Sequence, residues 1–385
     1  MAAPGGRPPE LAEIFKAHAV PLERLGSERR RVVRDIISCR TPLLGGHLFV
    51  CDHCAREVPL YNSCRNRHCP KCQNLEQARW VEAQQRSLLP VEYFHLVFTV
   101  PKALHPFFLA DRRGSYAKLF EASLQTLHDV CRRRLGALPG TIAVLHTWTQ
   151  TLTFHPHLHC IVTGGGLSTS GDRWIASRPG FLVPVRVLSR VFKAKLLDRF
   201  EQALHQRTCG LGVSLGTRLL RQAASRQWVV YGKAPLAGPA QVLRYLGRYT
   251  HRIAIGNERL LAFQDGQVTL RYRDRKRSTT KRLTLEAPNF IQRFLLHVLP
   301  RRFVRVRHFG LQANGSRSRL IPRARQMLHA PAPPQPDHAH REAWQHLYQR
   351  LTGRNPTRCP YCHRGLLHPL SSTASQDPHH NPRGP

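Results

Sequence analysis

One short run of alternating residues constrains the fold of this chain more than any other feature. His155, His157 and His159 occupy every second position, and apolar residues such as Leu158 and Cys160 lie between or directly after them. Successive side chains of an extended strand point to opposite faces, so the run predicts a strand with a histidine face and a buried apolar face. Because neutral imidazole is a common metal ligand, the histidine face predicts a metal site on a half-exposed antiparallel sheet.

The simpler alternative is that surface histidines alternate here by chance, because the chain contains 23 of them. The regular alternation with apolar residues favours the metal site over this alternative. Residues 164–166, all glycine, follow the run, and we expect them to turn the chain away from the sheet.

The rest of the chain mixes helical and strand patterns without a regular β–α–β order, which favours an α+β fold with a central antiparallel sheet and flanking helices. Periodicity predicts helices over residues 75–89, 116–131, 186–204 and 239–249, and strands over residues 93–100, 142–148, 152–162, 228–231, 259–263 and 268–273. We expect residues 1–10 to be disordered, 11–90 to form a cysteine- and histidine-rich module, 91–315 to contain the sheet, and 316–385 to form a basic, mobile tail rich in proline and histidine.

The charge of the chain indicates a polyanionic partner. Lys and Arg number 59 against 23 Asp and Glu, which gives a formal net charge of +36. Nucleic acid is the partner that fits this excess, and arginines spread along the whole chain argue against a membrane-surface helix. We find no apolar run that could span a bilayer and no signal peptide, so we expect a cytoplasmic protein.

Two CxxC pairs predict a structural zinc site. Cys51 and Cys54 form the first pair, Cys69 and Cys72 form the second, and two such pairs complete a tetrahedral set of thiolates. Without an export signal, the 11 cysteines are expected in a reducing compartment, where clustered thiols indicate metal. The fold expected for residues 11–90 is therefore zinc-ribbon-like.

Other residues could take part in this module. The candidates that could replace one ligand or hold a second ion are Cys39, His47, His53, Cys64 and His68. A third CxxC, Cys359 with Cys362, is either a half-site that nearby histidines could complete or a pair without a metal. Arg65, Arg67 and Lys71 place positive charge beside the second pair, where a phosphate backbone could lie.

A pair of tyrosines stands out in the later part of the chain. Tyr245 and Tyr249 lie four residues apart on the expected helix, and therefore on one of its faces. Arg244 and Arg248 lie close to them, and guanidinium groups suit phosphate. The alternative is that both tyrosines are packing residues at the border of the core. The predicted metal site and the net charge together favour a catalytic role.

The motifs described above resemble those of the HUH single-strand endonucleases. Residues 157–159 resemble their His-hydrophobic-His motif, residues 98–101 their first strand, and Tyr245 with Tyr249 their two-tyrosine version. Over roughly residues 11–320 the chain resembles the transposases of the insertion-sequence 91 family. The segments that carry this resemblance are 39–41, 44–47, 61–64, 68–73, 164–167, 245–249 and 294–310.

The resemblance implies a transposase that moves an insertion sequence by a rolling-circle-like route through single-stranded DNA. It implies a zinc-binding, DNA-binding domain over residues 11–90 and an HUH nuclease domain over residues 91–315. The expected partner is DNA, especially the single-stranded ends of a mobile element, with no membrane involved.

The implied chemistry uses a divalent ion, Mg²⁺ or Mn²⁺, held by His157, His159 and a third ligand, for which His155 and Gln150 are the candidates. Attack by a tyrosine leaves a 5′-phosphotyrosine and a free 3′-hydroxyl. Because the bond energy is retained, we expect no nucleotide cofactor.

Two other functions stay open at this stage. One is a plasmid-type rolling-circle replication initiator, against which the zinc module in front of the nuclease argues. The other is a zinc-ribbon DNA-binding regulator without catalysis, which would leave single-stranded DNA intact in the presence of Mg²⁺. A zinc hydrolase fits less well, because no carboxylate that could act as a general base lies next to the histidines.

Overall fold

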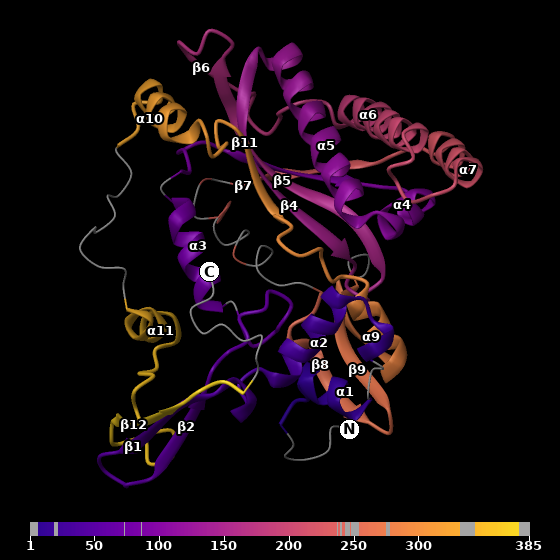
Figure 1. The fold of residues 1–385 in the computed structure, drawn as a ribbon. Coiled ribbons are helices and arrows are strands. Elements are labelled where there is room, and N and C mark those ends of the chain that lie inside the picture. The colour runs from indigo at the N-terminus through magenta and orange to yellow at the C-terminus, as the bar shows by residue number, and fades with distance from the viewer. Residues whose placement is uncertain are drawn as a thin grey trace. The chain divides into compact units, whose positions relative to one another are not determined.

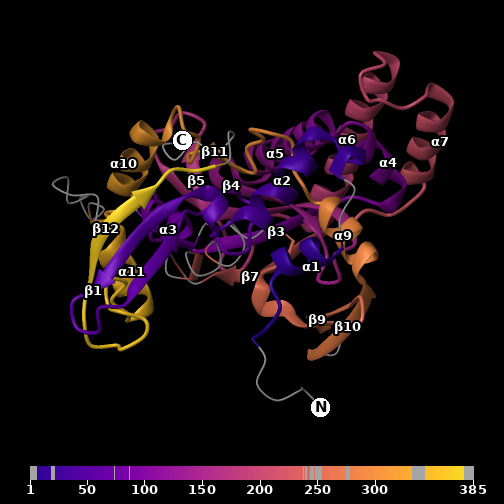
Figure 2. The same ribbon diagram turned by 60° about the horizontal axis from the view of Figure 1, so that its bottom comes forward.

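The structure is a computed structural model, and it describes residues 7–18, 22–72, 74–85, 87–236, 238, 241–242, 247, 254–274, 278–331 and 343–376. The chain divides into two compact units, each of which collects separate stretches of the sequence (Figure 1, Figure 2). The first unit contains Met1–Arg79, His251–Val298 and Gln335–Pro385. The second contains Trp80–Thr250 and Leu299–Pro334.

An antiparallel sheet forms the centre of the second unit (Figure 1). Its strands follow the order β11-β4-β5-β3-β7, and β6 pairs with β5 beside this path. The strands are β3 (Tyr93–Thr99), β4 (Ala137–Trp148), β5 (Phe154–Ser168), β6 (Trp174–Ala176), β7 (Val230–Leu236) and β11 (Val306–Gly310). The sheet confirms the predicted α+β fold, and β5 contains the run of alternating histidines.

The helices of the second unit include those predicted over residues 116–131 and 186–204, together with others that the sequence did not predict. They are α4 (His105–Ala110), α5 (Arg112–Leu135), α6 (Val185–His205), α7 (Val213–Ala224) and α10 (Arg317–Met327), while α3 (Asn74–Gln85) contains the boundary between the units. Helix α5 ends at Gly136, whose φ of 69° is the left-handed conformation common after a helix.

None of the described helices is long and apolar enough to cross a bilayer.

Helix α6 covers the apolar face of the sheet. Phe98 of β3 lies opposite Leu158 of β5, so both side chains point to the same face. Phe98 packs edge to face on Phe192 of α6, with ring centroids 5.1 Å apart. Because side chains alternate along β5, the histidines point to the opposite face of the sheet.

The glycine run does not end β5, which corrects the expectation from the sequence. The strand continues through the three glycines to Ser168 and pairs there with β4 and β6. A Cβ on Gly164 would lie 2.9 Å from the carbonyl oxygen of Glu92, and a Cβ on Gly166 would clash with that of Leu138. The glycines therefore let neighbouring backbones approach closely inside the sheet.

The first unit is built around two small antiparallel sheets. One has the order β12-β1-β2 and the other β10-β9-β8. The strands are β1 (Gly46–Cys51), β2 (Glu57–Tyr61), β8 (Leu260–Gln264), β9 (Gln267–Asp274), β10 (Thr279–Glu286) and β12 (Leu367–Thr373), and the helices are α1 (Leu11–Ala17), α2 (Ser27–Ser38), α9 (Ala287–Leu295) and α11 (Trp344–Thr352). The predicted hairpin of β8 and β9 is present, and its turn residues Asp265 and Gly266 have the positive φ that such a turn requires.

The boundaries of the units differ from the predicted contiguous domains. Strands β8–β10 and helix α9 fall within the predicted 91–315 domain, but they belong to the same unit as the first helix of the chain. Phe15 of α1 packs edge to face on Phe294 of α9, with ring centroids 5.6 Å apart. The backbone amide of Leu11 also donates a hydrogen bond to the side chain of Asn257. Long-range contacts of this kind leave no local signal in the sequence.

The expected mobile tail over residues 316–385 also needs correction, because its described part contains α10, α11 and β12. Strand β12 pairs with β1 in a register that sets Leu367 opposite Cys51 and Thr373 opposite Gly46. Helix α10 packs Ile321 and Ala324 against a buried cluster of Leu89, Leu167 and Leu311, whereas β12 is held by its backbone pairing with β1.

Candidate metal centres

Three histidines from two neighbouring strands converge on the face of the central sheet that lies opposite helix α6. His146 of β4 lies directly opposite His157 of β5, so the two imidazoles share a face, and His159 lies on that face two residues later. One ring nitrogen from each of the three lies within 4.8 Å of the others. His146 and His159 are 4% and 5% exposed, and His157 is partly buried.

Hydrogen bonds fix the orientation of two of these rings. Nδ1 of His157 lies 2.7 Å from the backbone carbonyl oxygen of His155, to which it donates, so its Nε2 is left for an ion. Nδ1 of His159 lies 2.9 Å from Nε2 of His95, a fourth histidine that is 2% exposed. Partners of this kind orient metal-binding imidazoles in proteins.

The sequence did not reveal His146 or His95. Both lie within predicted strands, but only the strand register brings them to His157 and His159, and the register cannot be read from a single strand. A polar residue inside an otherwise apolar strand, as His146 is within residues 142–148, was the available signal.

The two residues proposed from the sequence as third ligand do not belong to this group. The ring of His155 lies beside those of His157 and His105, with centroids 5.1 Å and 6.2 Å away, but its nitrogens are not part of the converging group, and burial lowers its pKa. Gln150 lies in the turn between β4 and β5, beyond the end of the strand that carries His146. Three imidazoles leave coordination positions open, which is typical of a catalytic rather than a structural site.

Four of the predicted site residues lie outside the described residues: Arg244, Tyr245, Arg248 and Tyr249. The start of their segment is described, and Val242 is fully buried against Tyr93, Ile142 and Ile161. Ile161 follows His159 by two positions and therefore lies on the histidine face. The chain thus enters the tyrosine segment on the same face of the sheet as the three histidines.

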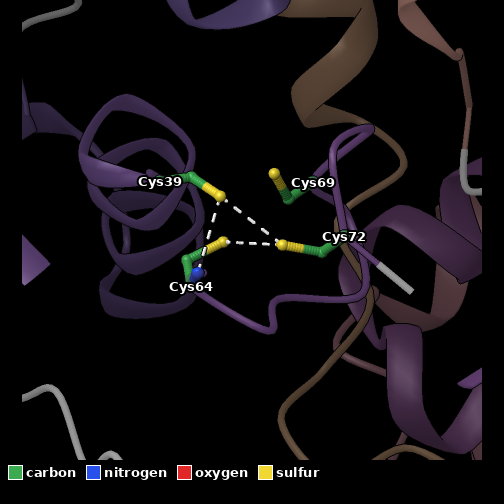
Figure 3. Close-up of side chains that lie close together, drawn as sticks. All are labelled: Cys39, Cys64, Cys69 and Cys72. Atoms are coloured by element: carbon green, nitrogen blue, oxygen red, sulfur yellow. Dashed lines mark hydrogen bonds between the residues drawn. The ribbon is translucent and has the colours of Figure 1, made fainter. Parts of the chain in front are cut away.

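In the first unit, four cysteines form a cluster that Figure 3 shows. Cys39 follows helix α2, Cys64 follows strand β2, and Cys69 and Cys72 lie on one tight turn. The Sγ of Cys72 lies 3.5 Å from that of Cys39 and 3.7 Å from that of Cys64. These separations are too long for disulfides and close to the spacing of four sulfurs that each lie about 2.3 Å from one zinc ion.

The protonation of this cluster also points to a cation. The pKa of Cys39 is lowered, mainly by its hydrogen bond with the thiol of Cys64. The pKa of Cys72 is lowered as well, mainly by its hydrogen bond with the thiol of Cys39. The same Cys39 raises the pKa of both Cys64 and Cys69. Three buried sulfurs and one partly buried sulfur cannot all ionise next to one another unless a positive ion compensates their charge, which is what zinc supplies.

The two CxxC pairs of this unit do not share a site, which corrects the prediction that Cys51, Cys54, Cys69 and Cys72 bind one ion. Cys51 and Cys54 instead lie with Cys359 and Cys362 in a second group of four thiols. The reason is the β1–β2 hairpin: Gly46 pairs with Tyr61 at one end, and Cys51 lies at the other. The length of β1, about 16 Å at 3.3 Å per residue, separates the two pairs.

The basic residues predicted beside the second pair differ in their surroundings. Arg65 is exposed, Arg67 is partly buried, and burial lowers the pKa of Arg67. Lys71 forms an ion pair with Glu10. Arg65 is therefore the best placed of the three to meet a phosphate.

Comparison with known proteins gives one family. Residues 11–100 match a family model described as "Transposase zinc-binding domain", and residues 140–319 match one described as "Putative transposase". The "Putative transposase y4qJ" of Sinorhizobium fredii (strain NBRC 101917 / NGR234) is 42% identical over 374 residues, 93% of this chain and 94% of that protein. The "Transposase for insertion sequence element IS801" of Pseudomonas savastanoi pv. phaseolicola is 28% identical over 353 residues, 86% of this chain and 83% of that protein. No solved structure gives a significant match.

The matched regions contain two of the clusters described above. The cluster of Cys39, Cys64, Cys69 and Cys72 lies within the zinc-binding model, and the three histidines lie within the second model. A transposase binds and processes DNA, which agrees with the net charge of +36. The first unit therefore carries structural zinc, and the chain belongs to the insertion-sequence 91 family of transposases.

Proposed function

We propose that this transposase cleaves and rejoins single-stranded DNA through a 5′-phosphotyrosine intermediate, and so drives rolling-circle-type transposition of an insertion sequence. The observation that carries the proposal is the convergence of His146, His157 and His159 on one face of the sheet. In this scheme Tyr245 and Tyr249 are the nucleophiles. The substrate is the single-stranded end of a mobile element in the cytoplasm.

The three histidines fit a divalent ion with open coordination positions. Each offers one ring nitrogen, and the hydrogen bonds of His157 and His159 hold their rings in place. Of Mg²⁺ and Mn²⁺, the transition ion Mn²⁺ suits three imidazole ligands better, because Mg²⁺ prefers oxygen. When bound, the ion supplies Lewis-acid polarisation of the scissile phosphate.

The residues of the chain carry out the transfer itself. The phenol oxygen of one tyrosine forms a bond to phosphorus, the bond to the 3′ oxygen breaks, and the proton of the phenol ends on the released 3′-hydroxyl. A phenol has an ordinary pKa near 10 and is therefore mostly protonated at neutral pH. In this scheme the positive charges of Arg244 and Arg248 favour the reactive phenolate. Because the phosphotyrosine retains the bond energy, a DNA 3′-hydroxyl can reverse the step without a nucleotide cofactor.

The position of Val242 supports the choice of nucleophiles. Val242 is buried on the histidine face of the sheet, and Tyr245 follows it by three residues. The tyrosine segment therefore begins on the face of the sheet that carries the imidazoles.

Labelled single-stranded DNA incubated with Mn²⁺ and resolved on a denaturing gel tests this function. The wild-type chain should form a covalent adduct, and His157→Ala with His159→Ala should abolish it while DNA binding persists. Tyr245→Phe with Tyr249→Phe keeps the side-chain volume and removes the hydroxyls, so this variant should fold and form no adduct. An adduct from the double-Phe protein would show that the nucleophile lies elsewhere.

The same experiment separates the rival functions. A DNA-binding regulator would leave the strand intact with every variant. A replication initiator would also form the adduct, and the family membership is what favours a transposase over it.

A further inference from the structure

The second group of four thiols joins parts of the chain that are far apart in the sequence. Sγ of Cys51 lies 3.7 Å from Sγ of Cys362, and Sγ of Cys54 lies 3.8 Å from Sγ of Cys359. All four sulfurs lie within 4.8 Å of one another. A disulfide requires about 2.05 Å between two sulfurs, so the arrangement fits four ligands around a common point rather than two disulfides.

The two turns that carry these cysteines have the same backbone conformation. The residue after the second cysteine has a positive φ in both turns, 54° at Ala55 and 55° at His363. Its amide donates to the carbonyl oxygen of the first cysteine, at 3.0 Å in the first turn and 3.1 Å in the second. Non-glycine residues rarely adopt this conformation, so its repetition in two unrelated segments indicates a shared requirement.

The chain directly after Cys362 lies very close to the turn that carries Cys51 and Cys54. The amide of Gly365 donates to Sγ of Cys362 at 3.5 Å, as amides do to metal-bound thiolates. A Cβ on Gly365 would lie 2.5 Å from Sγ of Cys51, so only glycine fits at this position. Asp52 accepts a hydrogen bond from the amide of Leu366 at 2.8 Å, which ties the first turn to the segment that follows the second.

Hydrophobic burial alone is a weak explanation for this arrangement. The local core consists of Cys51, Val58, Cys359 and Leu367, so half of its buried residues are cysteines. Cys359 is fully buried and Cys51 is 2% exposed. A core of this size does not offset the entropy of ordering the strands around it, and small modules of this kind depend on a metal.

We propose that Cys51, Cys54, Cys359 and Cys362 bind a second structural zinc ion that fastens β12 to β1. The matched zinc-binding model ends at residue 100 and does not contain the second pair. In this arrangement the sheet β12-β1-β2 is a zinc ribbon assembled from two distant parts of the chain. Four thiolates leave no open position, so the ion is structural.

Zinc content of the full-length protein tests the proposal. The background is His157→Ala with His159→Ala, which removes the nitrogen site and leaves both thiol groups intact. This protein should contain two zinc ions per chain. Cys359→Ala with Cys362→Ala should reduce the content to one, and Cys209→Ala, at a buried cysteine outside both groups, should leave it at two.

A milder variant keeps all four ligands. Gly365→Ala should lower the affinity for one of the two ions, so that a chelator concentration that leaves the parent protein loaded removes one zinc. Cobalt exchanged into the same proteins should show thiolate charge-transfer absorption at both sites in the parent and at one in the double-Ala variant.

Three results would overturn the proposal. They are two zinc ions in the double-Ala variant, a single zinc ion in the parent with the Cys51 group open to a thiol reagent, and no effect of Gly365→Ala on either ion. None of these readings depends on cleavage activity, so failure of the proposed function would leave this test intact.

Discussion

His95 offers a sharp test of how the histidine site works, because it contacts a proposed ligand and not the ion. Its Nε2 lies 2.9 Å from Nδ1 of His159, and its side chain is 2% exposed. His95→Phe fills the same space and removes this hydrogen bond. We expect the imidazole of His159 to lose its fixed orientation, which weakens metal binding without removing a ligand.

The size of the effect follows from the burial of this contact. Loss of one buried hydrogen bond costs about 1–3 kcal/mol, which corresponds to a factor of roughly 5–150 in affinity. Loss of a partner that orients a metal ligand typically costs about 10–100-fold in metal affinity. The Mn²⁺ concentration for half-maximal cleavage should therefore rise by about 10–100-fold, while the rate at saturating Mn²⁺ stays close to that of the wild type.

The assay is a Mn²⁺ titration of adduct formation on single-stranded DNA. His128→Phe is the matched control, since its buried Nε2 has no hydrogen-bond partner among the described residues. An unchanged Mn²⁺ dependence of His95→Phe would refute the positioning role. A reduced rate that saturating Mn²⁺ does not restore would point to a structural defect instead.

Three further predictions follow from the rest of the molecule. Cys64→Ser, outside every CxxC pair, should remove one zinc ion and unfold the first unit, whereas Cys209→Ser should do neither; zinc content and circular dichroism measure this. If about six phosphates are contacted, affinity for single-stranded DNA should fall by about 10²–10³-fold between 50 and 200 mM salt, and a salt-independent affinity would contradict the role of the net charge. Burial lowers the pKa of His308 to about 4, below its unfolded value near 6.5, so its neutral form is favoured in the fold. Its contribution to stability, at most about 3 kcal/mol, is full above pH 6.5 and is lost as the pH falls toward 4; His308→Gln should flatten this part of the pH dependence of urea unfolding.

The histidine site shows how far the sequence leads and where it stops. Alternation along residues 154–162 predicted the strand and the common face of His157 and His159, because these depend only on the period of the strand. The pairing of His146 with His157 depends on the register between β4 and β5, which contains irregularities on both sides of the histidines. No local pattern encodes such a register. The third ligand predicted from the sequence was therefore His155 or Gln150 and not His146.

The cysteines show the same limit at longer range. Each CxxC was recognisable because its spacing alone sets two thiols on one turn. Which pairs share an ion depends on where the β1–β2 hairpin carries Cys51 and on the pairing of β1 with β12. Both are long-range contacts that a single sequence does not show. The prediction therefore joined the two CxxC pairs that are closest to each other in the sequence.

The division of the first unit among three stretches of the chain determines when it can fold during synthesis. Most of the central sheet comes from one continuous stretch, since β3 to β7 lie between residues 93 and 236. The sheet β12-β1-β2, by contrast, needs residues 46 and 373 in the same ladder. Domains ordinarily fold in the order in which they leave the ribosome. Here β1 and its cysteines emerge early but must wait for β12, so the module that begins the chain is completed after the one that follows it.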